Sequence, residues 1–329
     1  MRIHHLSCGS LCPLGGRLFG AAGGPWAPAP MCCHCLLIEG DHGLILVDSG
    51  LGVEDITDPK RLGLLFNWTI RPRLEVAETA LRQVVDLGFR PTDLRHIIPT
   101  HLDLDHAGGL GDFPDATVHV FAPELRAARE PTLWERGRYR MAQLREVVNW
   151  APLHVDGEEW FGFASVRALP GTRDDVLLIP LAGHSRGHCG VAVRTAGGWL
   201  LHCGDAYFHR SEVAPCGGLA PLGLRLFESL VNVDGAARRA NQERLRQLTR
   251  ATMGAVRLIC SHDPAELAAC KKRDSIDSDF IRRCDHERTD TRATRSRRDP
   301  PASIASLPLP IERRPHSYAL ARQSRTRRP

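Results

Sequence analysis

The sequence predicts an α/β fold, and two observations carry this prediction. Short apolar runs typical of strands alternate with longer segments that have helical periodicity, which is the order found in α/β proteins. Four of the predicted strands also end directly at a histidine or an aspartate, and the carboxyl ends of strands are where such folds place their reactive groups. The chain has 329 residues, 43% of them hydrophobic and 25% charged, so it can form a full core.

The first predicted elements form a hairpin. Strands over residues 35–39 and 44–48 flank the turn Asp41-His-Gly43, and the second strand stops at Asp48-Ser-Gly50. A helix is predicted over residues 74–87, with Gly88 at its C-terminal end. The remaining predicted elements are strands at residues 96–100, 118–121, 176–181, 199–202 and 256–260, and helices at residues 123–129 and 236–252.

The positive charge of the chain is concentrated in its C-terminal part. The formal net charge is +5, but residues 271–329 hold 16 Lys and Arg against 8 Asp and Glu. Residues 1–270 are therefore mildly acidic, which gives no support to a basic face for nucleic acid. We expect one domain over residues 1–270 and a basic, disordered tail over residues 271–329, because the apolar residues of the tail show no period.

The composition indicates neither export nor membrane insertion. No run approaches the roughly 18 apolar residues of a membrane span, and glycines and prolines interrupt residues 11–30, where a signal peptide would need an apolar segment. We therefore expect a cytoplasmic protein with reduced thiols among its 11 cysteines. Cys32, Cys33 and Cys35 lack a matching CxxC partner, so a strand is favoured there over a metal cluster.

One segment carries most of the chemistry. Residues 100–109 read THLDLDHAGG and place His101, Asp103, Asp105 and His106 on one tight loop after a strand. Imidazole and carboxylate groups are ligands of zinc, manganese and iron in proteins, and the glycines let the backbone turn close to such a site. Three further strand ends carry polar motifs: Gly183-His184 followed by Gly187-His188, then Gly204-Asp205, and finally Ser261-His262-Asp263.

In this order, the four motifs resemble the metallo-β-lactamase superfamily, whose pattern is HxHxDH followed by a later His, a bridging Asp and a last His. The strand that ends at Asp48-Ser-Gly50 is also similar to the Asp-Thr-Gly of that superfamily. The resemblance covers about residues 1–270 and implies a four-layer αβ/βα sandwich. The motifs are most similar to the branch of lactonases that open N-acyl homoserine lactones.

The resemblance implies a centre of two divalent metal ions, with zinc favoured and manganese or iron as alternatives. Asp205 would bridge the two ions. The other implied ligands are His101 and His184 for the first ion, and Asp105, His106 and His262 for the second.

Asp103 departs from the family pattern, since it stands where the second His is found. A carboxylate is a harder donor than imidazole and shifts the preference toward iron or manganese. Three roles stay open for Asp103: it binds the first ion directly, binds it through water, or leaves the first position weak.

The implied mechanism is attack on a carbonyl by a metal-bridging hydroxide. Metal binding lowers the pKa of water to about 7, and the cations stabilise the oxyanion that develops on an ester, lactone or thioester. Asp105 would then pass a proton to the leaving oxygen. In the lactonase branch a Tyr three residues after the bridging Asp holds the substrate. Tyr207 comes two residues after Asp205 and is a candidate for that role, with packing in the core as the alternative.

Several other residues are assigned supporting roles. We expect His188 to make a hydrogen bond behind the ligands and Asp48 to orient a ligand without binding metal. Strand alternation places His202 on the face opposite to Asp205. Residues 134–150, which include Arg138, are expected to cover the pocket, with a surface helix pair as the alternative.

We therefore expect a metal-dependent hydrolase that acts on a small carbonyl substrate. Neither nucleic acid nor a membrane is expected as a partner, and the sequence leaves open whether the chain forms a homodimer. One alternative is an iron-dependent redox enzyme or oxygenase, suggested by Asp103. Another is a metal-binding scaffold that has lost catalysis. A nuclease is less favoured because residues 1–270 are acidic. Hydrolysis of β-lactams is also less favoured, because no export signal is indicated.

Overall fold

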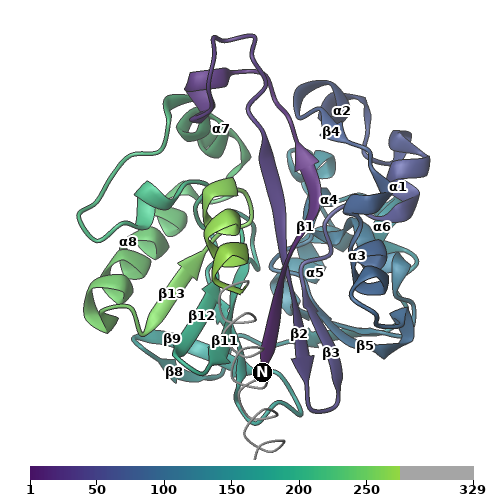
Figure 1. Ribbon diagram of the computed structural model, residues 1–329, viewed down its shortest axis with the longest axis vertical. Coiled ribbons are helices and arrows are strands. Elements are labelled where there is room, and N and C mark those ends of the chain that lie inside the picture. The colour runs from purple at the N-terminus through teal and green to yellow at the C-terminus, as the bar shows by residue number, and fades with distance from the viewer. Residues whose placement is uncertain (275–329) are drawn as a thin grey trace, which may run out of the picture. The chain divides into compact units, whose positions relative to one another are not determined.

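Two β-sheets pack face to face in the computed structural model, which describes residues 1–274 (Figure 1). The strand order is β4-β1-β2-β3-β5-β6-β7 in the first sheet and β13-β12-β11-β10-β9-β8 in the second. The strands are β1 (Arg2–Leu11), β2 (Met31–Gly40), β3 (Gly43–Val47), β4 (Pro72–Arg73), β5 (Leu94–Ile98), β6 (Thr117–Phe121), β7 (Trp150–Leu153), β8 (Glu158–Trp160), β9 (Phe163–Ala168), β10 (Val176–Pro180), β11 (Cys189–Thr195), β12 (Gly198–His202) and β13 (Val256–Ile259).

Helices flank the two sheets on their outer sides (Figure 1). The α-helices are α1 (Val53–Thr57), α2 (Leu64–Thr69), α3 (Ala80–Asp86), α4 (Leu104–Ala107), α5 (Ala122–Arg129), α6 (Met141–Leu144), α7 (Leu222–Val231) and α8 (Gly235–Thr252). The short 3-10 helices are η1 (Gly16–Phe19), η2 (Pro59–Arg61), η3 (Val76–Glu78), η4 (Pro91–Asp93), η5 (Gly108–Asp112), η6 (Glu135–Gly137) and η7 (Arg210–Val213).

Alternating side chains build three apolar layers. On β2, Leu36 and Ile38 belong to the core between the sheets, whereas Leu37 belongs to the core beneath the helices of the first sheet. On β10, Leu178 lies in the core between the sheets and Ile179 in the core beneath α8. Since both faces of these strands are buried, they appear in the sequence as continuous apolar runs. The four-layer αβ/βα sandwich implied by the resemblance is thereby confirmed.

The predicted hairpin is present, and the predicted helix over residues 74–87 is divided. Strands β2 and β3 pair antiparallel, with Gly40 opposite Gly43. Thr79 has an extended backbone and its side chain accepts a hydrogen bond from Arg82 N, so α3 begins only at Ala80 and η3 precedes it. Gly88 follows the end of α3 with a φ of 89°, a conformation that favours glycine.

The strands that precede the polar motifs end at a common edge of each sheet. In the first sheet, β3, β5 and β6 run parallel to one another. In the second sheet, β10 and β12 both run antiparallel to β11, and β12 is parallel to β13. The carboxyl ends of these strands therefore bring the motifs together, although they are far apart in the sequence.

Residues 264–274 are helical, so the domain boundary expected near residue 270 falls within a helix. The tail expected over residues 271–329 lies, from residue 275 onward, outside the described residues. Among residues 1–274, no helix is long and apolar enough to span a membrane. The cysteines of this part of the chain are free thiols, in agreement with the expectation of reduced cysteines.

Candidate metal centre

Asp48 connects the end of β3 to the polar loop that follows β5. It has a φ of 55°, a strained conformation for a residue other than glycine. Its carboxylate accepts hydrogen bonds from Thr100 N at 2.6 Å, from Thr100 Oγ1 at 3.0 Å and from His106 Nδ1 at 2.9 Å. Because the carboxylate only accepts, His106 carries a proton on Nδ1, so Nε2 is the ring nitrogen that would bind a metal.

Asp205 lies at the centre of the polar cluster. Its Oδ1 is 3.4 Å from His106 Nε2 and 3.2 Å from His262 Nε2. Its Oδ2 is 3.8 Å from His101 Nε2 and 3.5 Å from His184 Nε2. We name the buried group His101, Asp205 and His184 the first position, and the buried group His106, Asp205 and His262 the second position.

The spacing at the second position fits a bound metal ion. Its three donor atoms are 3.2, 3.3 and 3.4 Å apart, and donors that lie 2.0–2.1 Å from a tetrahedral zinc are about 3.4 Å from one another. The Asp105 carboxylate is 3.6 Å from His262 Nε2 and 3.9 Å from His106 Nε2. Asp205 Oδ1 is buried and makes no hydrogen bond within residues 1–274, and the same holds for His101 Nε2 at the first position.

Arg138 reaches the first position from the segment between α5 and β7. Its Nε and Nη2 donate to the two oxygens of Asp103, each at 2.6 Å, and Nη2 also donates to His184 Nε2 at 2.8 Å. Asp103 Oδ2 is 3.1 Å from His184 Nε2 and 3.4 Å from His101 Nε2. The structure thus brings Asp103 to the histidines of the first position, but with its carboxylate paired to a guanidinium.

The electrostatics of the cluster favour cations. Burial opposes protonation of His106, but the neighbouring carboxylates, led by Asp205, raise its pKa well above the ordinary value. Burial also opposes ionisation of Asp205, yet His262 and His106 hold its pKa well below the usual range. Burial, and then the charge of Arg138, lower the pKa of His184 to about 4. The His184 ring is therefore neutral near pH 7 and can act as a donor to a metal.

His188 and Gly204 support Asp205 from behind. His188 Nε2 accepts a hydrogen bond from Asp205 N at 2.9 Å, and Nδ1 donates to Leu181 O at 3.1 Å. Gly204 has a φ of 53°, and a Cβ at this residue would lie 2.6 Å from His188 Nε2 and 2.8 Å from Thr100 Oγ1. Glycine is therefore required here, and His188 has the supporting position expected from the sequence.

The structure does not bring Tyr207 to the cluster. Its buried hydroxyl donates to Glu266 at 3.1 Å, and the ring packs in the core beneath α8. The next residue, Phe208, lies at the cluster instead, where its ring stacks on His262 with centroids 5.1 Å apart. Phe208 comes three residues after Asp205, which is the spacing of the substrate-holding Tyr in the lactonase branch, so the resemblance indicates an aromatic side chain at this place. His202 also lies outside the cluster, with Nε2 donating to His34 O at 2.7 Å.

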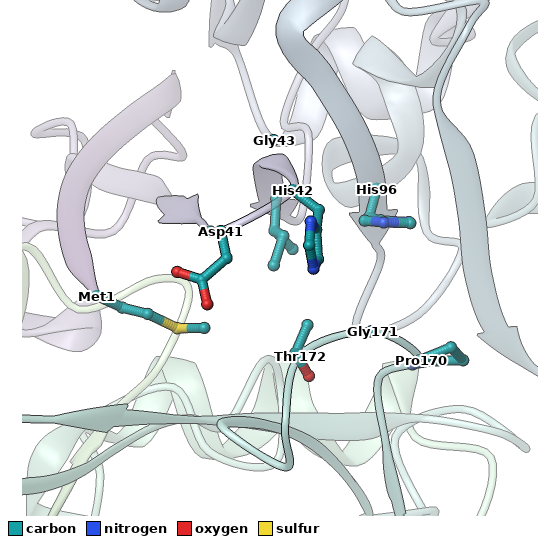
Figure 2. Close-up of a pocket in the computed structure, with 10 residues that line it drawn as sticks. Met1, Asp41, His42, Gly43, His96, Pro170, Gly171 and Thr172 are labelled. Carbon is teal, nitrogen blue, oxygen red and sulfur yellow. The ribbon is translucent and has the colours of Figure 1, made fainter.

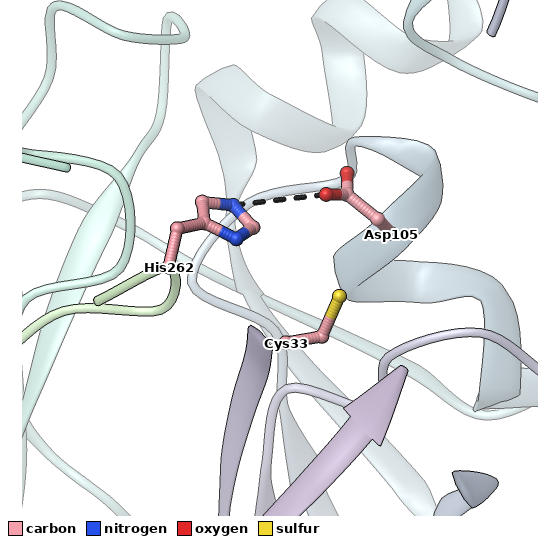
Figure 3. Close-up of side chains that lie close together, drawn as sticks. All are labelled: Cys33, Asp105 and His262. Atoms are coloured by element: carbon pink, nitrogen blue, oxygen red, sulfur yellow. Dashed lines mark ion pairs between the residues drawn. The ribbon is translucent and has the colours of Figure 1, made fainter. Parts of the chain in front are cut away.

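Cys33 lies beside the second position (Figure 3). The donor atoms of Cys33, Asp105 and His262 are all within 4.8 Å of one another. The strand expected around this cysteine is present as β2, but the thiol nevertheless faces the cluster. The sequence does not indicate a sulfur donor near the second position, because the partners of Cys33 are distant along the chain.

A pocket at the other end of β3 does not belong to the cluster (Figure 2). It is lined by Asp41 and His42 of the β2–β3 turn and by Thr172, among others. Its volume is about 40 Å³, too small for an organic substrate, since pockets for such ligands occupy roughly 300–1,000 Å³.

The known proteins similar to this chain include metallo-hydrolases and lactonases. The family model described as "Metallo-beta-lactamase superfamily" matches residues 30–215. The probable metallo-hydrolase Rv2300c of Mycobacterium tuberculosis is 42% identical over 265 residues, which cover 80% of this chain and 81% of that protein. The N-acyl homoserine lactonase AttM of Azorhizobium caulinodans is 29% identical over 246 residues, covering 72% and 83%.

Solved structures of lactonases share the fold. An AiiA variant of B. thuringiensis with N-decanoyl-L-homoserine at its active site aligns with a TM-score of 0.62 and 21% identity, covering 82% of this chain and 95% of that one. The dizinc quorum-quenching lactonase AidC aligns with a TM-score of 0.51 and 15% identity, covering 80% and 87%. At these identities the similarity concerns the fold alone.

Proposed function

The chain belongs to the metallo-β-lactamase superfamily and is a metallo-hydrolase, and we propose that it hydrolyses a small lactone, ester or thioester, with a lactone favoured. The observation that carries the proposal is the position of Asp205, whose two oxygens each face a different pair of histidines. The lactonase names among its relatives support a lactone as the first substrate to test.

The proposed metal is zinc. The two positions offer four histidines, and imidazole suits zinc, whereas carboxylates favour manganese. Asp103 does not favour iron, because both of its oxygens are paired with Arg138. When bound, the ions would supply an activated water as the nucleophile and a Lewis acid for the carbonyl. The proposed ligands are His101, His184 and Asp205 at the first position, and Asp105, His106, Asp205 and His262 at the second.

Asp105 is proposed to move the proton in the reaction. Its side chain is 13% exposed, whereas those of His106 and His262 are 1% and 2% exposed. Asp103 is similarly exposed, but its carboxylate is paired with Arg138. Asp105 is therefore the acid of the cluster that substrate can reach without displacing an arginine, and it can take a proton from the attacking water and deliver it to the leaving oxygen.

An apolar wall beside the second position supports a substrate with an acyl part. Phe208 stacks on His262 and contacts Phe227 of α7, with ring centroids 5.8 Å apart. Phe19 and Met31 pack against the apolar group that Phe208 forms with Ala220 and Leu224. This wall shields one side of the donors from water and offers apolar surface to a ligand.

The experiment that tests the proposal compares an N-acyl homoserine lactone, a simple ester and an acyl thioester as substrates of the zinc-loaded chain. We expect the lactone to turn over fastest, with activity lost on chelation and restored by zinc. Asp105→Asn should lower kcat by about 10²–10⁴. The matched control is Asp156→Asn, which changes a carboxylate that is 63% exposed and should leave kcat unchanged.

Three outcomes would contradict the proposal. Full turnover by metal-free protein would exclude metal-dependent hydrolysis. An active iron form beside an inactive zinc form would favour the redox alternative. Tight metal binding without turnover of any of the three substrates would favour a metal-binding scaffold.

A further inference from the structure

We propose that Arg138 makes the two metal positions unequal, so that an ion binds tightly at the second position and only weakly at the first. The guanidinium supplies a positive charge at the first position, and Asp103 serves as its anchor rather than as a metal ligand. This inference rests on the proposed function, because it concerns the same donor atoms.

Every N–H group of the Arg138 guanidinium has an acceptor. Nε and Nη2 donate to the two oxygens of Asp103 at 2.6 Å. Nη1 donates to His184 O at 3.0 Å and to Val231 O at 3.1 Å, and Nη2 also donates to His184 Nε2 at 2.8 Å. A guanidinium carries five N–H donors, so this side chain is fully paired in its place and keeps no donor for a substrate.

The contact with His184 Nε2 creates direct competition with a metal. His184 Nε2 lies 2.8 Å from Arg138 Nη2 and 3.1 Å from Asp103 Oδ2. A guanidinium can only donate, so in the shorter contact His184 Nε2 uses its single lone pair to accept from Arg138. A metal needs the same lone pair, because imidazole binds metals through its unprotonated nitrogen. An ion at the first position therefore requires that the guanidinium leave His184.

The pair of Arg138 and Asp103 resists that displacement. Their side chains are only 12% and 14% exposed, and a two-point contact between arginine and carboxylate is among the stronger hydrogen-bonded pairs. Separating the pair would leave two largely buried charges without partners, which is unfavourable. The pairing also accounts for a carboxylate at residue 103, where the resemblance predicts a second histidine.

The second position is removed from this competition. The Arg138 guanidinium donates to Asp103, His184 and Val231, whereas the donors of the second position lie 3.2 to 3.4 Å from one another. At the first position, the histidine nitrogens are 3.5 and 3.8 Å from Asp205 Oδ2, and the positive charge of Arg138 lies beside them. Since like charges at this range repel strongly in a buried site, a divalent ion is favoured at the second position.

The test is the metal content of the full chain and of two variants. Each protein is stripped with a chelator, titrated with manganese or zinc, desalted and submitted to elemental analysis. We expect the wild type to retain a single ion per chain. Arg138→Met removes the charge but keeps an apolar side chain, and it should retain a pair of ions, with the affinity for the second equivalent raised at least about tenfold. Arg136→Met changes an exposed arginine of the same segment and is the matched control, with a single ion expected.

Electron paramagnetic resonance of the manganese-loaded proteins gives a second measurement, which does not depend on the number of ions found by elemental analysis. The wild type should show an isolated ion and Arg138→Met a magnetically coupled pair. Should Arg138→Met fail to fold, Arg138→Gln keeps a hydrogen-bond donor for Asp103 without the charge and should give the same coupled signal.

The outcomes separate this inference from the proposed function. A pair of tightly bound ions in the wild type, or a single ion in both folded Arg138 variants, would overturn the inference and leave the proposed function standing. The absence of bound metal from the wild type and from every variant would overturn both.

Discussion

Replacement of Asp48 by asparagine should weaken metal binding at the second position while the fold persists. An amide offers one acceptor oxygen, and Thr100 N already needs it at 2.6 Å. The NH2 group of the introduced amide would then face His106 Nδ1, which the Asp48 carboxylate contacts at 2.9 Å in the wild type. Since an NH2 group can only donate, His106 would shift its proton from Nδ1 to Nε2, the atom that faces Asp205 and His262.

The magnitude follows from the loss of one hydrogen-bond partner of a metal ligand. Such changes lower metal affinity by about 10–100-fold, which corresponds to about 1.4–2.7 kcal/mol. The hydrogen bond from His106 to a charged carboxylate contributes about 1.5–3 kcal/mol to stability, so we also expect a lower free energy of unfolding.

The assay is competition for zinc between the protein and a chromophoric chelator, with the tautomer of His106 followed by NMR of the ring nitrogens. The matched control is Asp55→Asn, a buried carboxylate that accepts from Gly52 N and Gln143 Nε2 on the side of α1. Asp55→Asn should lower stability without changing zinc affinity. Zinc affinity of Asp48→Asn equal to that of the wild type would refute the reasoning.

Three further predictions concern the centre and its surroundings. Asp205→Ala should abolish turnover and lower the metal content at the second position, because Asp205 Oδ1 faces both of its histidines; elemental analysis that finds the wild-type content would contradict this. Burial raises the pKa of Glu266 from 4.5 to about 7, so the folded chain holds this proton at a pH where the unfolded chain has lost it, and stability from this group falls as the pH rises between these values. Glu266→Gln should remove this decrease, by up to about 3 kcal/mol, in urea unfolding followed from about pH 4 to pH 8; parallel curves for both proteins would disprove it. A chain that ends at Asp274 should keep the metal content and turnover of the full chain, measured side by side, because every proposed ligand precedes that residue, and a loss of either would show that the tail is needed.

The fold could be predicted from the sequence because local patterns specify most of it. The apolar runs, the Asp41-His-Gly43 turn and the four polar strand ends each depend on residues that are close along the chain. Strands β1, β4, β7, β8, β9 and β11 have no counterpart among the predicted elements. The start of α3 depends on the capping side chain of Thr79 rather than on helical periodicity.

The site could be predicted only as far as its motifs extend. Arg138 pairs with Asp103 across 35 residues of sequence, and neither residue type indicates this pairing. Tyr207 and Phe208 differ by one position, and one position decides whether a side chain faces the cluster or the core. Such contacts depend on tertiary packing, which periodicity does not report.

The proposed metal ligands come from both sheets, and this has a consequence for the order of folding. His101, Asp105 and His106 follow β5 of the first sheet, whereas His184, Asp205 and His262 follow strands of the second. Each position therefore combines donors from both halves of the sandwich, and these meet only after the apolar core between the sheets has closed. Metal should accordingly be acquired late in folding and should hold the two halves of a preformed sandwich together, so the stripped chain should keep its sheets while the halves separate more readily.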